Sequence, residues 1–169
     1  MDKPINNTRF LLGSMYIFLV TGSMVLMTSA LLSNLMQHYR LSYEQGGLLL
    51  SLLAAGSLIS NFLSGALAMR FGRKATLCIA AFCYLAGYAG LTLLPPLWAL
   101  QILLFITGLG WGAFNNLINF LVTLVTGGDG RKILMVHTAF SIGAFLAPLL
   151  LGITVSYGLS WRIPAGIDR

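Results

Sequence analysis

Two amides inside an uncharged, apolar stretch are the side chains of this sequence most suited to binding a solute. Asn115 and Asn119 lie one helical turn apart, so they share a face if the stretch is helical. Stepping back through Gly112 to Gly108 is expected to continue that face. Each amide needs partners for a donor and an acceptor, so it faces either a neighbouring helix or a watery cavity. Two interpretations stay open: the pair binds the hydroxyls of a neutral solute, or it clamps one helix to another. Asn116 points about 100° away and is expected to be a packing contact.

Other residue types that commonly carry chemistry are poorly placed. His38 and His137 are expected at opposite faces of a membrane, so they cannot share a metal ion. Cys78 and Cys83 lie in an apolar run without further ligands and are interpreted as small packing residues. The long apolar runs contain no Asp or Glu for acid–base or metal chemistry. We therefore predict no catalytic residues, no metal site, no cofactor and no enzymatic activity.

The elements that carry these residues are predicted to be membrane-spanning helices. Hydrophobic residues make up 57% of the chain and charged residues only 8%, and the mean hydropathy is +0.86, which is far from a soluble domain. A helix needs about 20 apolar residues to cross the hydrocarbon core. Five uncharged stretches meet that length, and the predicted fold is a single all-α transmembrane bundle over residues 1–169 with spans at 10–36, 46–69, 75–94, 97–126 and 133–157.

Small residues recur at intervals of four within these stretches, a pattern that lets helices approach closely in lipid. We expect most of them to pack helices together. The rows are Gly47, Ser51 and Ala55; Gly56, Ser60 and Ser64; Gly108 and Gly112; and Gly143 and Ala147.

The net charge of +6 is distributed as a topology signal rather than as a nucleic-acid-binding patch. A cytoplasmic N-terminus puts seven of the ten basic residues on the inner side and three on the outer side, as the positive-inside rule requires. The inner set is Lys3, Arg9, Arg70, Arg73, Lys74, Arg131 and Lys132, and the outer set is Arg40, Arg162 and Arg169. We predict an integral protein of the cytoplasmic (inner) membrane, with the lipid bilayer as a partner and no nucleic acid.

A basic, glycine-framed turn between the second and third stretches gives the most specific signal. The segment from Gly65 to Leu77 resembles the loop between the second and third helices of the major facilitator superfamily, Gly-x-Leu-x-Asp-Arg-x-Gly-Arg-Lys. The matching residues are Gly65, Leu67, Arg70, Gly72, Arg73 and Lys74. The resemblance implies that Gly65, Arg70, Gly72, Arg73 and Lys74 form a gating loop. Met69 stands where the family usually has aspartate, which weakens the expected gating contact.

Two further segments resemble the fucose-permease-like branch of that superfamily. One runs from Gly108 to Asn119, where glycines precede asparagines, and the other runs from His137 to Gly152. Pro148 leaves a backbone carbonyl without its helical partner, so a helix kink is expected there. The branch resemblance implies a small, polar, neutral and sugar-like solute, with Asn115 and Asn119 as its binding residues.

The resemblance covers the first half of the superfamily fold, which has two six-helix halves. The chain supplies five spans, and after the Trp161–Arg162 pair no sixth apolar run follows. The expectation is a truncated N-terminal portion of a secondary transporter. The alternative is a transport-incompetent membrane fragment with a structural or interaction role, which associates with a complementary half or with itself. Without a carboxylate in the spans, either coupling lies in another part or transport proceeds without protons.

Overall fold

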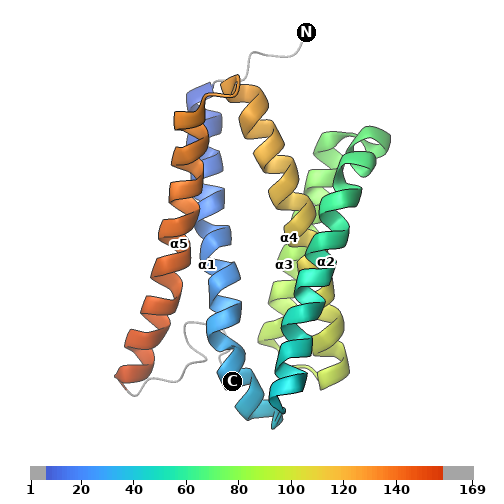
Figure 1. Cartoon of the computed structure of the whole chain (residues 1–169), viewed down its shortest axis with the longest axis vertical. Coiled ribbons are helices and arrows are strands. Elements are labelled where there is room, and N and C mark those ends of the chain that lie inside the picture. Colours follow the sequence, from blue (N-terminus) through green and yellow to red (C-terminus); the bar gives the residue numbers. More distant parts are fainter. Residues whose placement is uncertain (1–6, 158–169) are drawn as a thin grey trace. The chain divides into compact units, whose positions relative to one another are not determined.

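The computed structural model describes residues 7–157, which fold into five helices (Figure 1). No strand occurs in this described range. The helices are α1 (Asn7–Tyr39), α2 (Tyr43–Phe71), α3 (Arg73–Thr92), α4 (Leu97–Thr126) and α5 (Gly130–Ser156). All five are long and apolar enough to cross a membrane. The predicted all-α membrane fold is therefore confirmed.

The side chains that cover the helices suit a lipid environment. Phe62 of α2 is 79% exposed, Phe82 of α3 72% and Phe145 of α5 68%. Buried hydroxyls instead bond within their own helices: Thr21 Oγ1 donates to the Ile17 carbonyl at 2.8 Å, and Thr107 Oγ1 donates to the Leu103 carbonyl at 2.7 Å. A helix pairs its backbone groups internally, and these hydroxyls also bond within their own helices. Few unpaired polar groups are therefore presented to lipid.

The bounds of α4 equal the predicted span 97–126, and the ends of the other helices differ from their predicted spans by one to three residues. Most helices run past the uncharged stretch, because the end turns of a membrane helix tolerate polar residues at the surface. The third helix ends earlier than predicted, at Thr92 rather than Leu94. Leu94 has a φ of +46°, and Pro95 and Pro96 follow it. Prolines disfavour a helical residue before them, which ends the helix at this point.

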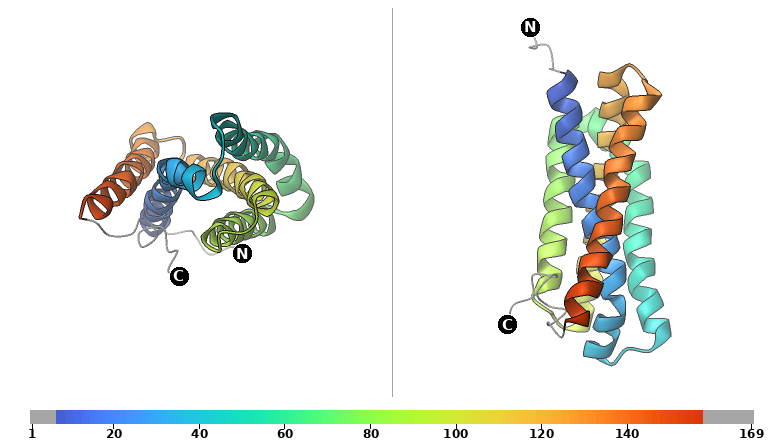
Figure 2. Two further views of the ribbon diagram at one scale, coloured as in Figure 1. Left: turned by 90° about the horizontal axis from the view of Figure 1, so that it is seen from below. Right: turned by 90° about the vertical axis from the view of Figure 1, so that its left-hand side faces the viewer.

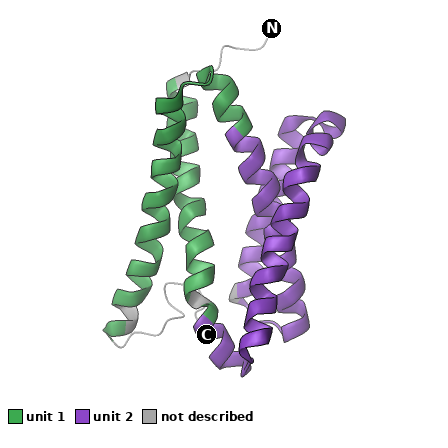
Figure 3. Ribbon diagram, in the orientation of Figure 1, with its two compact units in different colours: residues 1–32, 120–169 green, residues 33–119 purple. Residues whose placement is uncertain are grey.

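The chain divides into two compact units (Figure 3). Residues 1–32 and 120–169 form one unit, and residues 33–119 form the other. The first unit contains most of α1, the last turns of α4, and α5. The second contains the end of α1, all of α2 and α3, and most of α4. The expected single bundle over residues 1–169 stays a prediction.

In the unit of residues 1–32 and 120–169, α1 and α5 run side by side (Figures 1 and 2). Their backbones approach closely where a Cβ on Gly22 would meet the Phe140 carbonyl and one on Gly143 would meet the Leu19 carbonyl. Ser23 Oγ donates to the Gly143 carbonyl at 3.1 Å across this contact. The small residues on both helices therefore do the packing predicted for Gly143.

In the unit of residues 33–119, α4 packs against α2 and α3. A Cβ at Gly108 would meet the Leu53 carbonyl of α2, and a Cβ at Gly56 would meet the Phe105 carbonyl of α4. On the α3 side, Gly110 lies against the backbone of Tyr84 and Gly87 lies against Thr107. Two of the predicted small-residue rows, those of Gly56 and of Gly108, thus pack against one another.

One predicted packing row does not pack. Gly47, Ser51 and Ala55 are all exposed, and a Cβ at Gly47 would meet only open space. This face of α2 lies opposite the buried face of Gly56, Ser60 and Ser64. Packing was expected for most of these rows, and spacing alone does not show which side of an apolar helix meets a neighbour.

The turns between helices are closed by local hydrogen bonds. At the end of α1, Arg40 has a φ of +54°, and the Leu41 amide donates to the Met36 carbonyl at 2.9 Å. This is the Schellman arrangement that ends many helices. Ser42 then caps α2: its hydroxyl accepts from the Gln45 amide while the Gln45 side chain accepts from the Ser42 amide. This reciprocal pair forms a capping box.

Candidate functional site

Asn115 and Asn119 lie together on α4, as the sequence predicts. Asn119 Nδ2 donates to Asn115 Oδ1 at 3.0 Å and to the Asn115 carbonyl at 3.0 Å. Both residues are half-buried. The Asn115 amide nitrogen donates no hydrogen bond to any described residue. An amide donor in this setting is free to bind an oxygen of another molecule.

Asn116 has a different role on the same helix. Its Nδ2 donates to Ser64 Oγ at 2.8 Å and to the Asn61 carbonyl at 3.1 Å, both on α2. These two bonds tie α4 to α2, so the predicted packing contact is confirmed. Asn116 thus clamps α4 to α2, which is the structural role that stays open for Asn115 and Asn119.

The face expected to run from Asn119 through Gly112 to Gly108 also carries the contact with α2. Gly108 and Gly112 point at α2, where a Cβ on Gly112 would meet the Ser57 carbonyl. Steps of seven residues return to nearly the same side of a helix, and they lead from Gly108 to Asn115 and from Gly112 to Asn119. Asn115 is turned from Asn116 by about 100°. The predicted binding pair therefore forms a strip of α4 on the side of these glycines.

That strip continues to an aromatic pair that the sequence reasoning missed. Trp111 lies one turn before Asn115, and its ring is 5.7 Å from the ring of Tyr84 on α3. The Tyr84 hydroxyl is buried and has no hydrogen-bond partner among the described residues. The four-residue interval from Trp111 through Asn115 to Asn119 could have placed Trp111 on this strip. Tyr84 lies on another helix, so no interval in the sequence relates it to the strip. An aromatic face beside amides is suited to an amphipathic solute.

The basic turn between α2 and α3 is centred on Gly72. Its φ of +87° and ψ of +147° lie in a region that only glycine adopts readily. The Gly72 carbonyl accepts from the Thr76 amide at 3.1 Å and from Thr76 Oγ1 at 3.0 Å, which starts α3. The Arg70 guanidinium lies 5.4 Å from the centre of the Phe71 ring. The geometry accounts for the glycine in the motif.

The other residues of the predicted gating loop are at the surface. Gly65, Arg73 and Lys74 are exposed, and so is Met69, which stands at the position of the usual aspartate. Their gating role stays a prediction.

Pro148 lies within α5, which is continuous from Gly130 to Ser156. Because proline has no amide hydrogen, the carbonyl of Ala144 lacks its usual helical donor. A kink at this point stays a prediction.

Residues 7–157 contain few acidic side chains and few side chains that could bind a metal ion. No group of three His, Cys, Asp or Glu residues in this range could hold a metal ion. Glu44 lies in the first turn of α2, and Asp129 precedes α5. Asp129 Oδ2 pairs with Lys132 Nζ at 3.3 Å, and Asp129 Oδ1 accepts from the Arg131 amide at 3.0 Å. These two interactions hold the pKa of Asp129 below its ordinary value.

Several bacterial proteins resemble this chain over most of its length. It is 25% identical over 158 residues to the "Protein TsgA homolog" of Serratia proteamaculans (strain 568), an alignment of 92% of this chain and 40% of the relative. It is 26% identical over 158 residues to the homolog of Yersinia enterocolitica, again 92% of this chain and 40% of the relative. A homolog of Buchnera aphidicola is 24% identical over 143 residues, 83% of this chain and 37% of the relative.

The chain thus spans about two fifths of the length of the curated relatives it matches. No solved structure matches it. The model of the Major Facilitator Superfamily matches residues 12–168, which is nearly the whole sequence. With its five membrane-length helices and its basic turn at Gly72, this chain belongs to the major facilitator superfamily.

Proposed function

We propose that this chain is part of a secondary transporter for a small, polar, neutral solute and that Asn115 and Asn119 contact that solute. Superfamily membership supports transport rather than catalysis. The single observation that carries the solute site is the unused amide donor of Asn115, half-buried in a membrane helix beside the Asn119 amide. A donor that has no partner among residues 7–157 is costly in this position unless water or a ligand takes the bond.

A sugar-like solute fits the strip of α4 that holds these residues. Sugar hydroxyls accept and donate hydrogen bonds, which matches the two functions of an amide. Trp111, which is half-buried one turn before Asn115 and packs on the buried Tyr84 ring, adds aromatic surface to this strip. The only carboxylate in the candidate spans of the described helices is Glu44, in the first turn of α2, so the interior of these spans carries no acidic group that would favour a cation over an uncharged solute. The resemblance of the α4 and α5 segments to the fucose-permease-like branch points to the same solute class.

We further propose a cytoplasmic N-terminus in the inner membrane, on the distribution of basic residues. Alternating access requires two helix bundles around a central site. We assign transport to this chain together with the remaining helices of a full-length relative. We call that combined protein the extended transporter.

The test compares the three asparagines of α4 in the extended transporter. Uptake of a panel of radiolabelled neutral sugars is measured in proteoliposomes, and stability is measured by thermal unfolding. Asn115→Ala should lower uptake about tenfold, the effect expected from losing roughly 1.4 kcal/mol of hydrogen bonding, with an unchanged melting temperature. Asn116→Ala is the matched control. It should lower the melting temperature, because it removes two bonds between α4 and α2.

The opposite assignment of effects would contradict the proposal. If Asn115→Ala unfolds the protein at lower temperature while uptake per folded molecule is unchanged, Asn115 is a structural clamp. If no neutral sugar is taken up by the unmodified extended transporter, the solute class is wrong. Saturable uptake by this chain alone would instead point to a small transporter that completes its site by self-association.

A further inference from the structure

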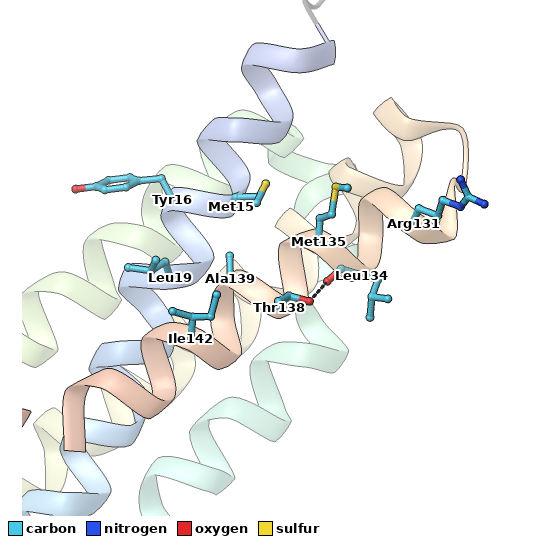
Figure 4. A pocket seen from close by; sticks show the side chains of 9 residues that line it. All are labelled: Met15, Tyr16, Leu19, Arg131, Leu134, Met135, Thr138, Ala139 and Ile142. Atoms are coloured by element: carbon cyan, nitrogen blue, oxygen red, sulfur yellow. Dashed lines mark hydrogen bonds between the residues drawn. The ribbon is translucent and has the colours of Figure 1, made fainter. Parts of the chain in front are cut away.

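A groove of about 500 Å³ lies between α1 and α5, within the unit of residues 1–32 and 120–169 (Figure 4). Its α1 wall is made by Met15, Tyr16 and Leu19. The α5 wall runs from Arg131 to Ile142 and is mostly aliphatic. Thr138 does not make it polar, because its hydroxyl donates to the Leu134 carbonyl at 2.9 Å within the same helix. The groove is therefore lined by apolar side chains and one charged residue, Arg131.

The length of the groove corresponds to one leaflet of a bilayer. An α-helix rises about 16 Å between Arg131 and Ile142, and half of the hydrocarbon core is about 15 Å thick. Just beyond Ile142, the backbone of Gly143 lies so close to the backbone of Leu19 that no side chain fits between them. The groove thus starts at the membrane surface beside the α4–α5 turn and stops near mid-membrane.

The charged residue lies at the surface end of the groove. Arg131 is in the first turn of α5 and is exposed. Its guanidinium makes no ion pair or hydrogen bond with any described residue, whereas the neighbouring Lys132 pairs with Asp129 at 3.3 Å. Arg9 lies seven residues before Tyr16, two turns along the same side of α1. Positive charge therefore gathers at one end of an apolar groove.

We infer that this groove binds an anionic phospholipid from the leaflet that contains the α4–α5 turn. One acyl chain lies between α1 and α5, and the Arg131 guanidinium binds the phosphate. Charge complementarity supports this occupant, because a planar guanidinium bonds a phosphate through two donors. A free phosphate uses none of the apolar wall, and a neutral helix leaves the guanidinium unpaired. Basic pockets between membrane helices are a general way to bind anionic headgroups.

The inference does not rest on the proposed solute site or on the direction of insertion. Its test uses the purified chain in detergent and measures bound lipid by native mass spectrometry. Dioleoyl phosphatidylglycerol and dioleoyl phosphatidylcholine are compared at equal concentration. We expect phosphatidylglycerol to be retained preferentially, with its affinity lowered about fivefold by Arg131→Gln. Arg40→Gln is the matched control at the opposite turn and should leave the affinity unchanged.

A second pair of variants tests the acyl-chain part of the site. Thr138→Phe places a ring in the groove and should lower phosphatidylglycerol binding even though every charge remains. Ser141→Phe adds the same ring to an exposed position of α5 that does not line the groove. It should have no effect. Glycerol phosphate, which has the headgroup chemistry but no acyl chain, should not compete with the lipid.

Several results would overturn the inference. Equal retention of the two lipids would show ordinary contact with detergent-like chains, and equal losses from Arg131→Gln and Arg40→Gln would show nonspecific charge attraction. Competition by glycerol phosphate would assign Arg131 to a free anion. Unchanged binding in Thr138→Phe would place the lipid elsewhere on the chain.

Discussion

Adding one methyl group to Gly108 should separate α4 from α2. An ideal Cβ at this position would lie 2.9 Å from the Leu53 carbonyl carbon, 3.1 Å from the Ser57 amide nitrogen and closer still to the Leu53 carbonyl oxygen. These obstacles are backbone atoms of a continuous helix, so no side-chain rotation relieves them. The two helices must move apart, and they lose the close packing that holds membrane helices together.

The magnitude follows from two opposing terms. Overpacking costs about 1–3 kcal/mol, and the upper end applies where the obstacle is backbone. Alanine is favoured over glycine in a helix by about 1 kcal/mol. Gly108→Ala should therefore lower the free energy of unfolding by about 2 kcal/mol. Gly47→Ala is the matched control, because a Cβ at Gly47 meets open space, and it should raise that free energy by up to about 1 kcal/mol.

Unfolding of the purified chain in mixed micelles, driven by added dodecyl sulfate and followed by circular dichroism, measures both variants. The two substitutions are chemically identical and both lie in membrane helices, so opposite signs can only come from their surroundings. Equal shifts for both variants would refute the α2–α4 packing. So would stabilisation by Gly108→Ala.

Three other outcomes are expected. Gly72→Ala should destabilise the chain by about 1–3 kcal/mol in the same assay, because its φ of +87° strains any other residue; an unaltered midpoint would show that the turn adopts another conformation. A cysteine introduced at Ser42 should react with an impermeant thiol reagent from outside the cell and one at Gly128 should not, and the reverse pattern would invert the proposed topology. The interactions of Asp129 with the Lys132 side chain and the Arg131 amide lower the pKa of its carboxyl group from the ordinary value of 3.8. They therefore stabilise the folded state at pH values above that ordinary pKa, and this contribution is lost as the pH falls through the lower pKa of the folded state. Asp129→Asn should flatten that acid-side dependence of the thermal midpoint, and a wild-type slope in the variant would contradict the assignment.

The number and approximate positions of the helices were predictable because they depend on the length and place of the uncharged apolar runs. A continuous uncharged run of about 20 apolar residues has the length of a spanning helix, which satisfies its backbone groups within the segment. The end of α3 was missed by two residues, although Pro95 and Pro96 were visible in the sequence. Gly72 was identified through the motif, and its positive φ explains why glycine stands there.

The orientation of polar residues within a helix was less predictable. Asn115 and Asn119 follow a four-residue interval, so their pairing could be foreseen. Whether Asn115 or Asn116 meets α2 depends on how α2 and α4 are rotated, and a single sequence holds no information on that rotation. For the same reason the four-residue spacing of the row at Gly47 does not reveal that this row is exposed. Tyr84 joins the α4 strip from another helix, which no spacing rule detects.

Water access to Asn119 tests the solute site most directly. In the extended transporter, with Cys78 and Cys83 replaced by serine, we compare Asn119→Cys with Phe62→Cys, whose native ring is 79% exposed on α2. A charged, water-soluble methanethiosulfonate reagent should modify the cysteine at position 119, and a transported sugar should slow that reaction. The cysteine at position 62 should stay unmodified, because a thiol in lipid remains protonated and unreactive. Lack of modification at both positions would contradict a solute-accessible site on α4.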